Sequence, residues 1–233
     1  MEVLKISGSG DKNGLAITGI TLDMRLGPLA FMNPDDAPNP PLAARRDAAK
    51  KWPGVRVVAE HGQEKRLKTY LQDAIGPGFS FPGCDLAVSD RAREILEPIL
   101  GSQVAFLDLD VVNAGRKYWA FYPTQYYSNL DPELCELSPP YSSAADRRPM
   151  MRKVGFVQSE ELEQLNVFRV PSTAAYSVFA PGTFATQKFL DLVMKHQLGG
   201  FTFRKNFHKG FRPSPGEQQV IVSNGPKYPL ADY

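Results

Sequence analysis

The feature that most constrains this chain is a segment in which a strand, a helix and a second strand follow one another without a long loop. Residues 85–88 form an apolar strand, and Ser89 is placed to accept a hydrogen bond from the first turn of a helix over 90–100. Residues 104–112 then predict a strand, because every second side chain from Ala105 to Val111 is apolar and these side chains would share one face.

A second segment repeats this order nearer the end of the chain. It has a strand at 177–180, a helix that ends near His196 and a strand at 201–207. The two segments share an order of elements but no residue-level repeat. Together they predict an α+β fold with mixed or mainly antiparallel sheets and two strand–helix–strand units.

The chain length and the glycine and proline content determine the domain organisation that we expect. The chain has 233 residues, which suit one large domain, and its 19 glycines and 20 prolines indicate many turns. We therefore expect a single α+β domain over 1–233, either undivided or with an N-terminal subdomain 1–84, a core 85–207 and a tail 208–233. Helical spacing of apolar residues over 64–75 predicts a further helix before the first unit.

Composition narrows the class of protein. Hydrophobic residues make up 42% and charged residues 22%, values that exclude wholesale disorder. No apolar run approaches ~18 residues and the first residues lack a secretory pattern, so we expect a cytoplasmic protein without a membrane partner. The two cysteines, Cys84 and Cys135, do not make a disulfide framework. We expect free thiols, and the sequence does not tell whether the two are close in space.

The charge is unevenly distributed along the chain. Residues 85–166 carry 8 basic and 13 acidic groups, whereas residues 167–233 carry 8 and 3. Such asymmetry marks a charged face for a macromolecular partner, or else acidic and basic segments that pair within the fold. The net charge of only +2 argues against nucleic acid as that partner.

Two carboxylates are the sharpest candidates for catalysis. Asp108 and Asp110 share one face of a strand, where an Asp-x-Asp pair can bind a divalent cation. The pair is similar to the opening motif of haloacid-dehalogenase-type phosphatases, although Val111 and Val112 continue the strand where that family turns. A metal-dependent phosphotransferase or hydrolase is the alternative that this pair supports, and a solvated strand face is the commoner explanation. No spacing of histidines or cysteines predicts a metal site, and no motif predicts a cofactor.

Two further groups of residues have the composition of protein-binding surfaces. One is an aromatic hairpin with Trp119, Tyr122, Tyr126 and Tyr127. The alternative is that these side chains pack in the core. The other is an acidic loop over 158–164 with Glu160, Glu161 and Glu163, which would otherwise be a solvated loop. We rank the acidic loop higher, because the core is expected to use part of the aromatic hairpin.

Short motifs in both units carry a resemblance to a known family. They are Leu-Ala-Val-Ser-Asp-Arg over 86–91, Gln-Val-Ala-Phe-Leu over 103–107, Asn-Val-Phe-Arg-Val over 166–170 and Leu-Gly-Gly-Phe-Thr-Phe over 198–203. The sequence over about 85–207 resembles immunity family eleven of bacterial polymorphic toxin systems, a former domain of unknown function.

The resemblance implies a binding protein rather than an enzyme. Such a protein neutralises a cognate toxin domain in a stoichiometric complex and needs no cofactor. The resemblance names neither the toxin nor a binding residue, and it leaves a homo-oligomer open. Wholesale mimicry of nucleic acid is not expected, because that strategy requires a strongly acidic protein and this chain has a net charge of +2.

Overall fold

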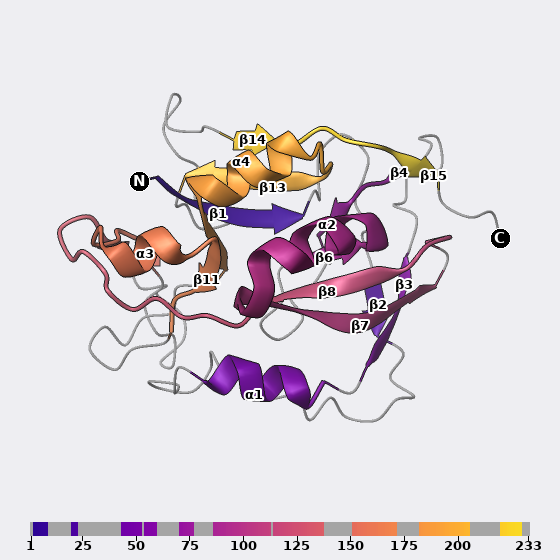
Figure 1. The fold of residues 1–233 in the computed structure, drawn as a ribbon, viewed down its shortest axis with the longest axis horizontal. Helices are drawn as coiled ribbons and strands as arrows, with labels where there is room; N and C mark the ends of the chain where they lie inside the picture. Colours follow the sequence, from indigo (N-terminus) through magenta and orange to yellow (C-terminus); the bar gives the residue numbers. More distant parts are fainter. Residues whose placement is uncertain are drawn as a thin grey trace, which may run out of the picture.

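The computed structural model describes ten stretches of the chain. They are residues 2–8, 20–22, 43–52, 54–59, 70–76, 86–112, 114–137, 151–171, 182–205 and 220–229. Within them lie four α-helices and two main sheets, most of whose strand pairs are antiparallel (Figure 1). The expected α+β fold with mainly antiparallel sheets is therefore confirmed.

The larger sheet has six strands in the order β2-β3-β7-β8-β6-β5. Its bounds are β2 Ile20–Leu22, β3 Val55–Ala59, β5 Ala74–Ile75, β6 Ala87–Ser89, β7 Val104–Val112 and β8 Tyr118–Pro123. Strands β7 and β8 pair antiparallel, with Asp108 opposite Trp119. Strands β3 and β7 run parallel, and the other strand pairs of this sheet are antiparallel.

The second sheet has five strands in the order β11-β12-β1-β13-β14. Its bounds are β1 Val3–Gly8, β11 Val167–Arg169, β12 Thr183–Thr186, β13 Phe201–Lys205 and β14 Val220–Val222. Two short pairs complete the strands, namely β9 Glu136–Leu137 with β10 Met151–Lys153, and β4 Tyr70–Leu71 with β15 Tyr228–Pro229.

The two strand–helix–strand units have the same topology. In the first, β6 and β7 are both antiparallel to β8, so they run parallel to each other with β8 between them. In the second, β12 and β13 are both antiparallel to β1, which lies between them. The central strand follows directly along the chain in the first unit, whereas the second unit takes it from the N-terminus.

Each unit carries its helix on one face, and these two helices share one core. They are α2 Asp90–Leu100 and α4 Gln187–Lys195. Leu96 of α2 and Phe189 of α4 are both 0% exposed and belong to the same apolar cluster, with Ile6 of β1 and Phe121 of β8. The central strands of both sheets therefore contribute to the core that the helices cover.

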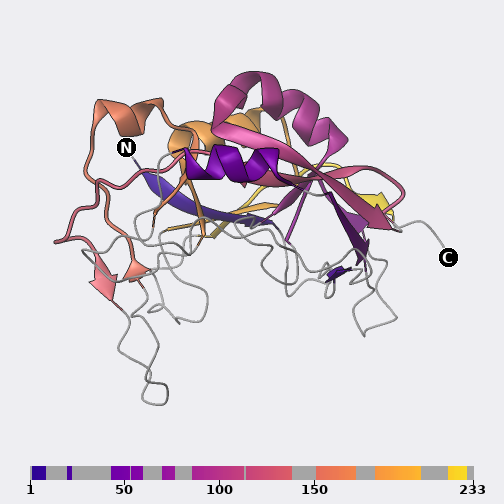
Figure 2. The ribbon, with the colours of Figure 1, turned by 90° about the horizontal axis from the view of Figure 1, so that it is seen from below.

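The other face of the six-stranded sheet is covered by α1 Ala44–Lys50 (Figures 1 and 2). Leu107 and Leu109 of β7 face this side, where Ala48 and Trp52 pack against them. Arg45 is buried, donates from Nε to the carbonyl of Pro123 and lies 4.0 Å above the Tyr122 ring. The Arg45 side chain thus fixes α1 to the end of β8.

Local signals predicted several elements correctly. The Oγ of Ser89 accepts a hydrogen bond from the N–H of Ala92 at 3.2 Å, so the predicted cap of α2 is confirmed. The helix α2 continues past Pro98 to Leu100. Proline has no N–H, but this costs the helix only one hydrogen bond near its end. The strand predicted at 177–180 lies outside the described residues.

Two predictions of local structure were wrong. Residues 70–71 and 74–75 are strands, not the end of a helix, because cross-strand partners override their helical spacing. The acidic segment is not a loop, since Glu160–Gln164 form the helix α3 after Ser159, whose Oγ accepts from the N–H of Leu162 at 3.2 Å. Leu162 of α3 is buried in a separate apolar cluster with Tyr127 and Phe168.

The sheets cross the boundaries of the subdivided alternative. Strand β1 belongs with strands from residues 167–222, and β15 pairs with β4. A division at 84 and 207 would separate paired strands, since β1 pairs with β12 and β13, and β13 pairs with β14. Among the described residues, no helix is both long and apolar enough to cross a membrane.

The two sheets approach each other at glycines. A Cβ built on Gly200, which has φ of +87°, would lie 2.1 Å from the carbonyl oxygen of Ala74. The N–H of Ala74 donates to the carbonyl of Gly199 at 2.9 Å, so the strand β5 is bonded directly to the second unit. Glycine is needed at 200 because the backbone of β5 occupies the space of a side chain.

We predict that Gly200→Ala destabilises the protein more than Gly101→Ala does. Both glycines have positive φ, but a Cβ at Gly101 meets no atom within 4 Å. Both variants therefore carry backbone strain, and only Gly200→Ala also displaces β5. Urea unfolding should show an additional loss of about 2 kcal/mol for Gly200→Ala. Equal losses would show that the close approach of the sheets is not rigid.

Candidate functional site

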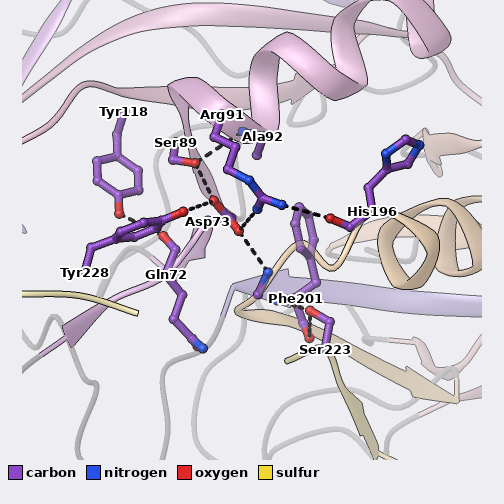
Figure 3. A network of polar contacts seen from close by, with 11 residues as sticks. Gln72, Asp73, Ser89, Arg91, Ala92, Tyr118, His196, Phe201, Ser223 and Tyr228 are labelled. Atoms are coloured by element: carbon purple, nitrogen blue, oxygen red, sulfur yellow. Dashed lines mark hydrogen bonds and ion pairs between the residues drawn. The ribbon is translucent and has the colours of Figure 1, made fainter. Parts of the chain in front are cut away.

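The most concentrated polar cluster that the structure describes surrounds the carboxylate of Asp73, between β5 and the neighbouring segments (Figure 3). Asp73 is 0% exposed. Its Oδ1 accepts from the hydroxyls of Ser89 at 2.8 Å and Tyr228 at 3.0 Å. Its Oδ2 accepts from Nη1 of Arg91 at 2.7 Å and from the N–H of Gly199 at 3.1 Å.

These four donors come from three separate parts of the chain, because Ser89 and Arg91 are only two positions apart. Ser89 ends β6, Arg91 lies in the first turn of α2, Gly199 precedes β13 and Tyr228 lies in β15. Arg91 also donates from Nη2 to the carbonyl of His196 at 3.0 Å, just after α4. The guanidinium therefore connects the two helices as well as neutralising the buried carboxylate.

Two tyrosines border this cluster in their neutral form. The hydroxyl of Tyr118 donates to the carbonyl of Gln72 at 2.8 Å, and burial raises the pKa of Tyr118 far above its ordinary value. Burial also raises the pKa of Tyr228, and the negative charge of Asp73 adds to the effect. Arg116 lies over the Tyr228 ring with its central carbon 3.3 Å from the ring centre. Both phenols are consequently held as donors.

The hydrogen bonds of this cluster give Asp73 a structural role. Each oxygen of Asp73 already accepts two hydrogen bonds, and a carboxylate with this set is an ionised acceptor rather than a proton donor. A buried charge is stable only with such partners. We therefore assign Asp73 to holding the two units together.

Sequence reasoning missed this cluster. Asp73 lies in a segment that was predicted as helix, and its partners stand 16, 18, 126 and 155 positions away. Ser89 was assigned a role only as a helix cap, while Arg91 and Gly199 were noted only as members of the motifs that carry the family resemblance. No local spacing connects these residues, so a contact map would be needed to find them.

The exposed acidic surface is the second candidate. Glu160, Glu161 and Glu163 are all exposed and lie in the first turn of α3, which Figure 1 places at the far left of the molecule. We call these three residues the α3 acidic surface. Carboxylates in the first turn of a helix interact favourably with its N-terminal dipole, so their charge supports the helix.

Contacts at both ends hold α3 in place. Before the helix, the Tyr127 hydroxyl lies 3.0 Å from the Oγ of Ser159 and donates to the carbonyl of Val157 at 2.6 Å. After it, the side chain of Gln103 donates to the carbonyl of Gln164 and accepts from the N–H of Asn166. The α3 acidic surface is therefore held on an ordered element that is fixed to the core.

The aromatic hairpin does not form the surface that its sequence predicted. Tyr122, Tyr126 and Tyr127 are 0%, 5% and 1% exposed, so these three candidate residues lie in the core and offer almost no area for contact. The physical reason is that Tyr122 belongs to the apolar cluster of Leu107 and Leu109, and Tyr127 to the cluster of Leu162 and Phe168. Trp119 alone of the four is partly exposed.

Trp119 is the centre of a smaller charged surface. Arg93 lies 3.9 Å above its ring centre, and Nζ of Lys117 lies 5.0 Å from it. Its Nε1 donates to the carboxylate of Asp90 at 2.5 Å. Trp and Arg are the residues that most often dominate binding energy at interfaces. This arrangement supports Trp119 as a contact residue without identifying the partner.

The two candidate catalytic aspartates are exposed on β7, as a solvated strand face requires. The carboxylate of Asp108 forms an ion pair with Lys117, and its carbonyl accepts from Nε1 of Trp52 at 2.8 Å. Within the described stretches, no group of three or more His, Cys, Asp or Glu side chains is arranged to hold a metal ion. Cys135 is a free thiol, as expected, whereas Cys84 lies outside the described residues.

We predict that Asp73→Asn destabilises the protein by about 3 kcal/mol, because an amide nitrogen would face a donor inside the cluster. Asp108→Asn is the matched control, since it removes the carboxylate of an exposed ion pair and should cost at most about 1 kcal/mol. Denaturant unfolding at neutral pH measures both values. Similar losses for the two variants would contradict the role of Asp73 in holding the two units together.

The raised pKa of Tyr228 predicts a sensitivity to alkaline pH. The folded state favours the neutral phenol, so its contribution to stability is present below pH of about 10 and is lost as the pH rises through the raised folded-state pKa. Tyr228→Phe should therefore lose less unfolding free energy than the wild type between about pH 8 and pH 11. An identical decline in both proteins would show that folding does not raise the pKa of Tyr228.

A scan of the chain against models of known protein families finds no match, and a search of curated proteins finds no similar chain. The function is therefore inferred from the residues of the chain and from the resemblance carried by its sequence motifs.

Proposed function

We propose that this protein is a cytoplasmic immunity protein that binds a cognate bacterial toxin domain and neutralises it in a stoichiometric complex, without turnover. The observation that carries the proposal is the α3 acidic surface, where Glu160, Glu161 and Glu163 are exposed on an anchored helix. The sequence resemblance to immunity family eleven of polymorphic toxin systems supplies the class of partner.

The anchoring of α3 matters for binding. Ordering a flexible loop on association reduces the affinity that the contacts would otherwise provide. Here Leu162 is buried and Ser159 caps the helix, so the three carboxylates are placed before any partner arrives. A surface of this kind fits a partner with a complementary basic patch.

The charge of this surface suggests how it would act. Exposed carboxylates attract a basic protein over distances of about a Debye length, roughly 10 Å at 0.1 M salt. They therefore raise the association rate more than they lower the dissociation rate. Trp119 with Arg93 is a second, less charged surface with the composition of an energetic anchor.

The resemblance is distributed over the units that build the fold. Its motifs at 86–91 and 103–107 lie on β6, α2 and β7, while those at 166–170 and 198–203 lie on β11 and the approach to β13. They include Ser89, Arg91 and Gly199, three of the four residues that bond to Asp73. The shared motifs thus describe the scaffold, which is consistent with a family whose members would differ in their contact surfaces.

The first experiment is co-expression with the product of the neighbouring gene. Growth rescue of the host and co-purification of the two chains in a 1:1 ratio are the expected results. The proposal of an immunity function fails if the neighbouring product is harmless alone, or if protection occurs without a complex.

We predict that replacing all three glutamates of the α3 acidic surface by glutamine slows association with that toxin domain on the order of tenfold at low salt. The salt dependence of the association rate should also become weaker. The wild type and the variant should have the same circular dichroism spectrum, because the substitution keeps the Ser159 cap and the buried Leu162. Stopped-flow mixing at two or more salt concentrations measures the rates.

The matched control is Glu94→Gln/Asp108→Asn/Asp110→Asn, which removes three exposed carboxylates from another part of the surface. This control should associate at nearly the wild-type rate and should still protect the host. Equal slowing of both triple variants would mean that overall charge, not the α3 acidic surface, governs association. Loss of a measurable hydrolase activity in the control would instead support the enzyme that the two aspartates suggested.

A further inference from the structure

Strand β14 is an edge strand of the five-stranded sheet that the described residues form. Its three residues are Val220, Ile221 and Val222, and only β13 pairs with it among the described strands. The side chains of Val220 and Val222 are 44% and 47% exposed, whereas Ile221 packs against the core. Two exposed valines therefore flank a partly buried isoleucine at the outer edge of the sheet.

The backbone of the same two valines faces outward. The N–H of Ser223 donates to the carbonyl of Phe201 at 2.9 Å. Because bonded and non-bonded pairs alternate in an antiparallel ladder, Ile221 bonds to β13, while Val220 and Val222 do not. Their N–H and C=O groups point away from β13, and the described residues give them no hydrogen-bond partner.

The opposite edge of this sheet is covered. The N–H of Arg169 in β11 donates to the carbonyl of Gln125, and its carbonyl accepts from the N–H of Tyr127, both at 2.9 Å. The chain thus closes the β11 edge with residues 125–127. It leaves β14 without the lysine, proline or bulge that usually protects an exposed edge.

We propose that β14 pairs antiparallel with β14 of a second copy of this chain, joining two five-stranded sheets across a two-fold axis at Ile221. The sequence Val-Ile-Val reads the same in both directions, so this pairing places Val220 opposite Val222 of the other copy and repeats the contact symmetrically. Each Val220–Val222 pair exchanges both of its backbone bonds, and every outward polar group of the edge is satisfied.

A second copy fits this edge better than a charged partner does. The three residues are neutral and apolar, and their exposed side chains would bury each other on one face of the joined sheet. The edge is short, so the pairing alone buries less area than the 1,200–2,000 Å² that is roughly typical of stable complexes. We therefore expect a weak dimer with a dissociation constant on the order of 10 μM or higher.

The proposed dimer does not depend on toxin binding. In the order β11-β12-β1-β13-β14, β14 is the last strand on one side, and α3 leads into β11 on the other. Figure 1 shows α3 at the left and β14 along the top of the molecule. A dimer through β14 leaves both copies of the α3 acidic surface accessible, so each proposal can fail without the other.

Val222→Pro tests the pairing without removing a bond to β13, because the N–H that proline lacks points outward. Sedimentation velocity over a concentration range of roughly 1–300 μM should show a wild-type dimer, and Val222→Pro should raise its dissociation constant at least about tenfold. The control Val222→Thr keeps the N–H and the β-branched shape, and it should raise the constant by less than about fivefold. Unfolding midpoints of all three proteins report whether the fold is intact.

A disulfide trap tests the two-fold axis directly. Residues opposite each other in a non-bonded antiparallel pair have Cα atoms about 4.5 Å apart, which a disulfide can span. Ile221→Cys in a Cys84→Ser/Cys135→Ser background should form a covalent dimer with oxidised glutathione as the oxidant. Met194→Cys in the same background is the control, since Met194 is 48% exposed on α4 and lies off the edge.

The outcomes decide between the two-fold pairing and its alternatives. A wild-type protein that stays monomeric at the highest concentration overturns the proposal. A dimer that Val222→Pro leaves unchanged, or that Met194→Cys traps as fast as Ile221→Cys does, places the interface elsewhere and overturns it as well. A dimer lost in Val222→Pro and trapped only through Ile221→Cys supports it.

Discussion

A single buried carboxylate determines how the two halves of this protein meet. Asp73 is inaccessible to solvent and accepts hydrogen bonds from Ser89, Arg91, Gly199 and Tyr228. An ionised group in that position would destabilise the fold by several kcal/mol if even one unit were displaced, because its donors come from both. The close backbone approach at Gly200 adds a steric constraint to the electrostatic one. The two units can therefore pack in few relative orientations. The relative positions of residues on their surfaces are fixed as a result.

The Asp73 cluster leaves the edges of the five-stranded sheet out of the contact between the two units. The donors to Asp73 come from neither edge strand of the five-stranded sheet, β11 or β14. One end is covered by residues 125–127, which also supply Tyr127 to position Ser159 and α3. At the other edge, β13 is the only described strand that pairs with β14. A rigid connection between the units thus fixes the α3 acidic surface relative to the core, while β14 is left at the opposite side of the same sheet.

Prediction from the sequence succeeded where a short stretch of chain contains its own reasons. The alternation of β7 and the Ser89 cap of α2 are local, and both are confirmed. It failed where distant partners decide the outcome. Residues 70–75 have helical spacing, yet bonds to β6 and β15 make them strands, and this error concealed Asp73. The glutamates were found as a charged run, but their helix was not, because five residues offer too little periodicity to distinguish a capped turn from a loop.

The aromatic residues show why composition alone misplaces a binding surface. Trp119, Tyr122, Tyr126 and Tyr127 are equally suited to an interface by type, and only their positions on alternate faces of β8 and on the following bridge separate them. Burial removes the three tyrosines, while Trp119 remains at the surface between Arg93 and Lys117. Carboxylates are different, since desolvation keeps an unpaired Glu at the surface wherever the chain places it. The acidic residues of α3 were therefore the more reliable indicator of an accessible surface, whereas Asp73, the one buried carboxylate in the described stretches, contacts its own four donors.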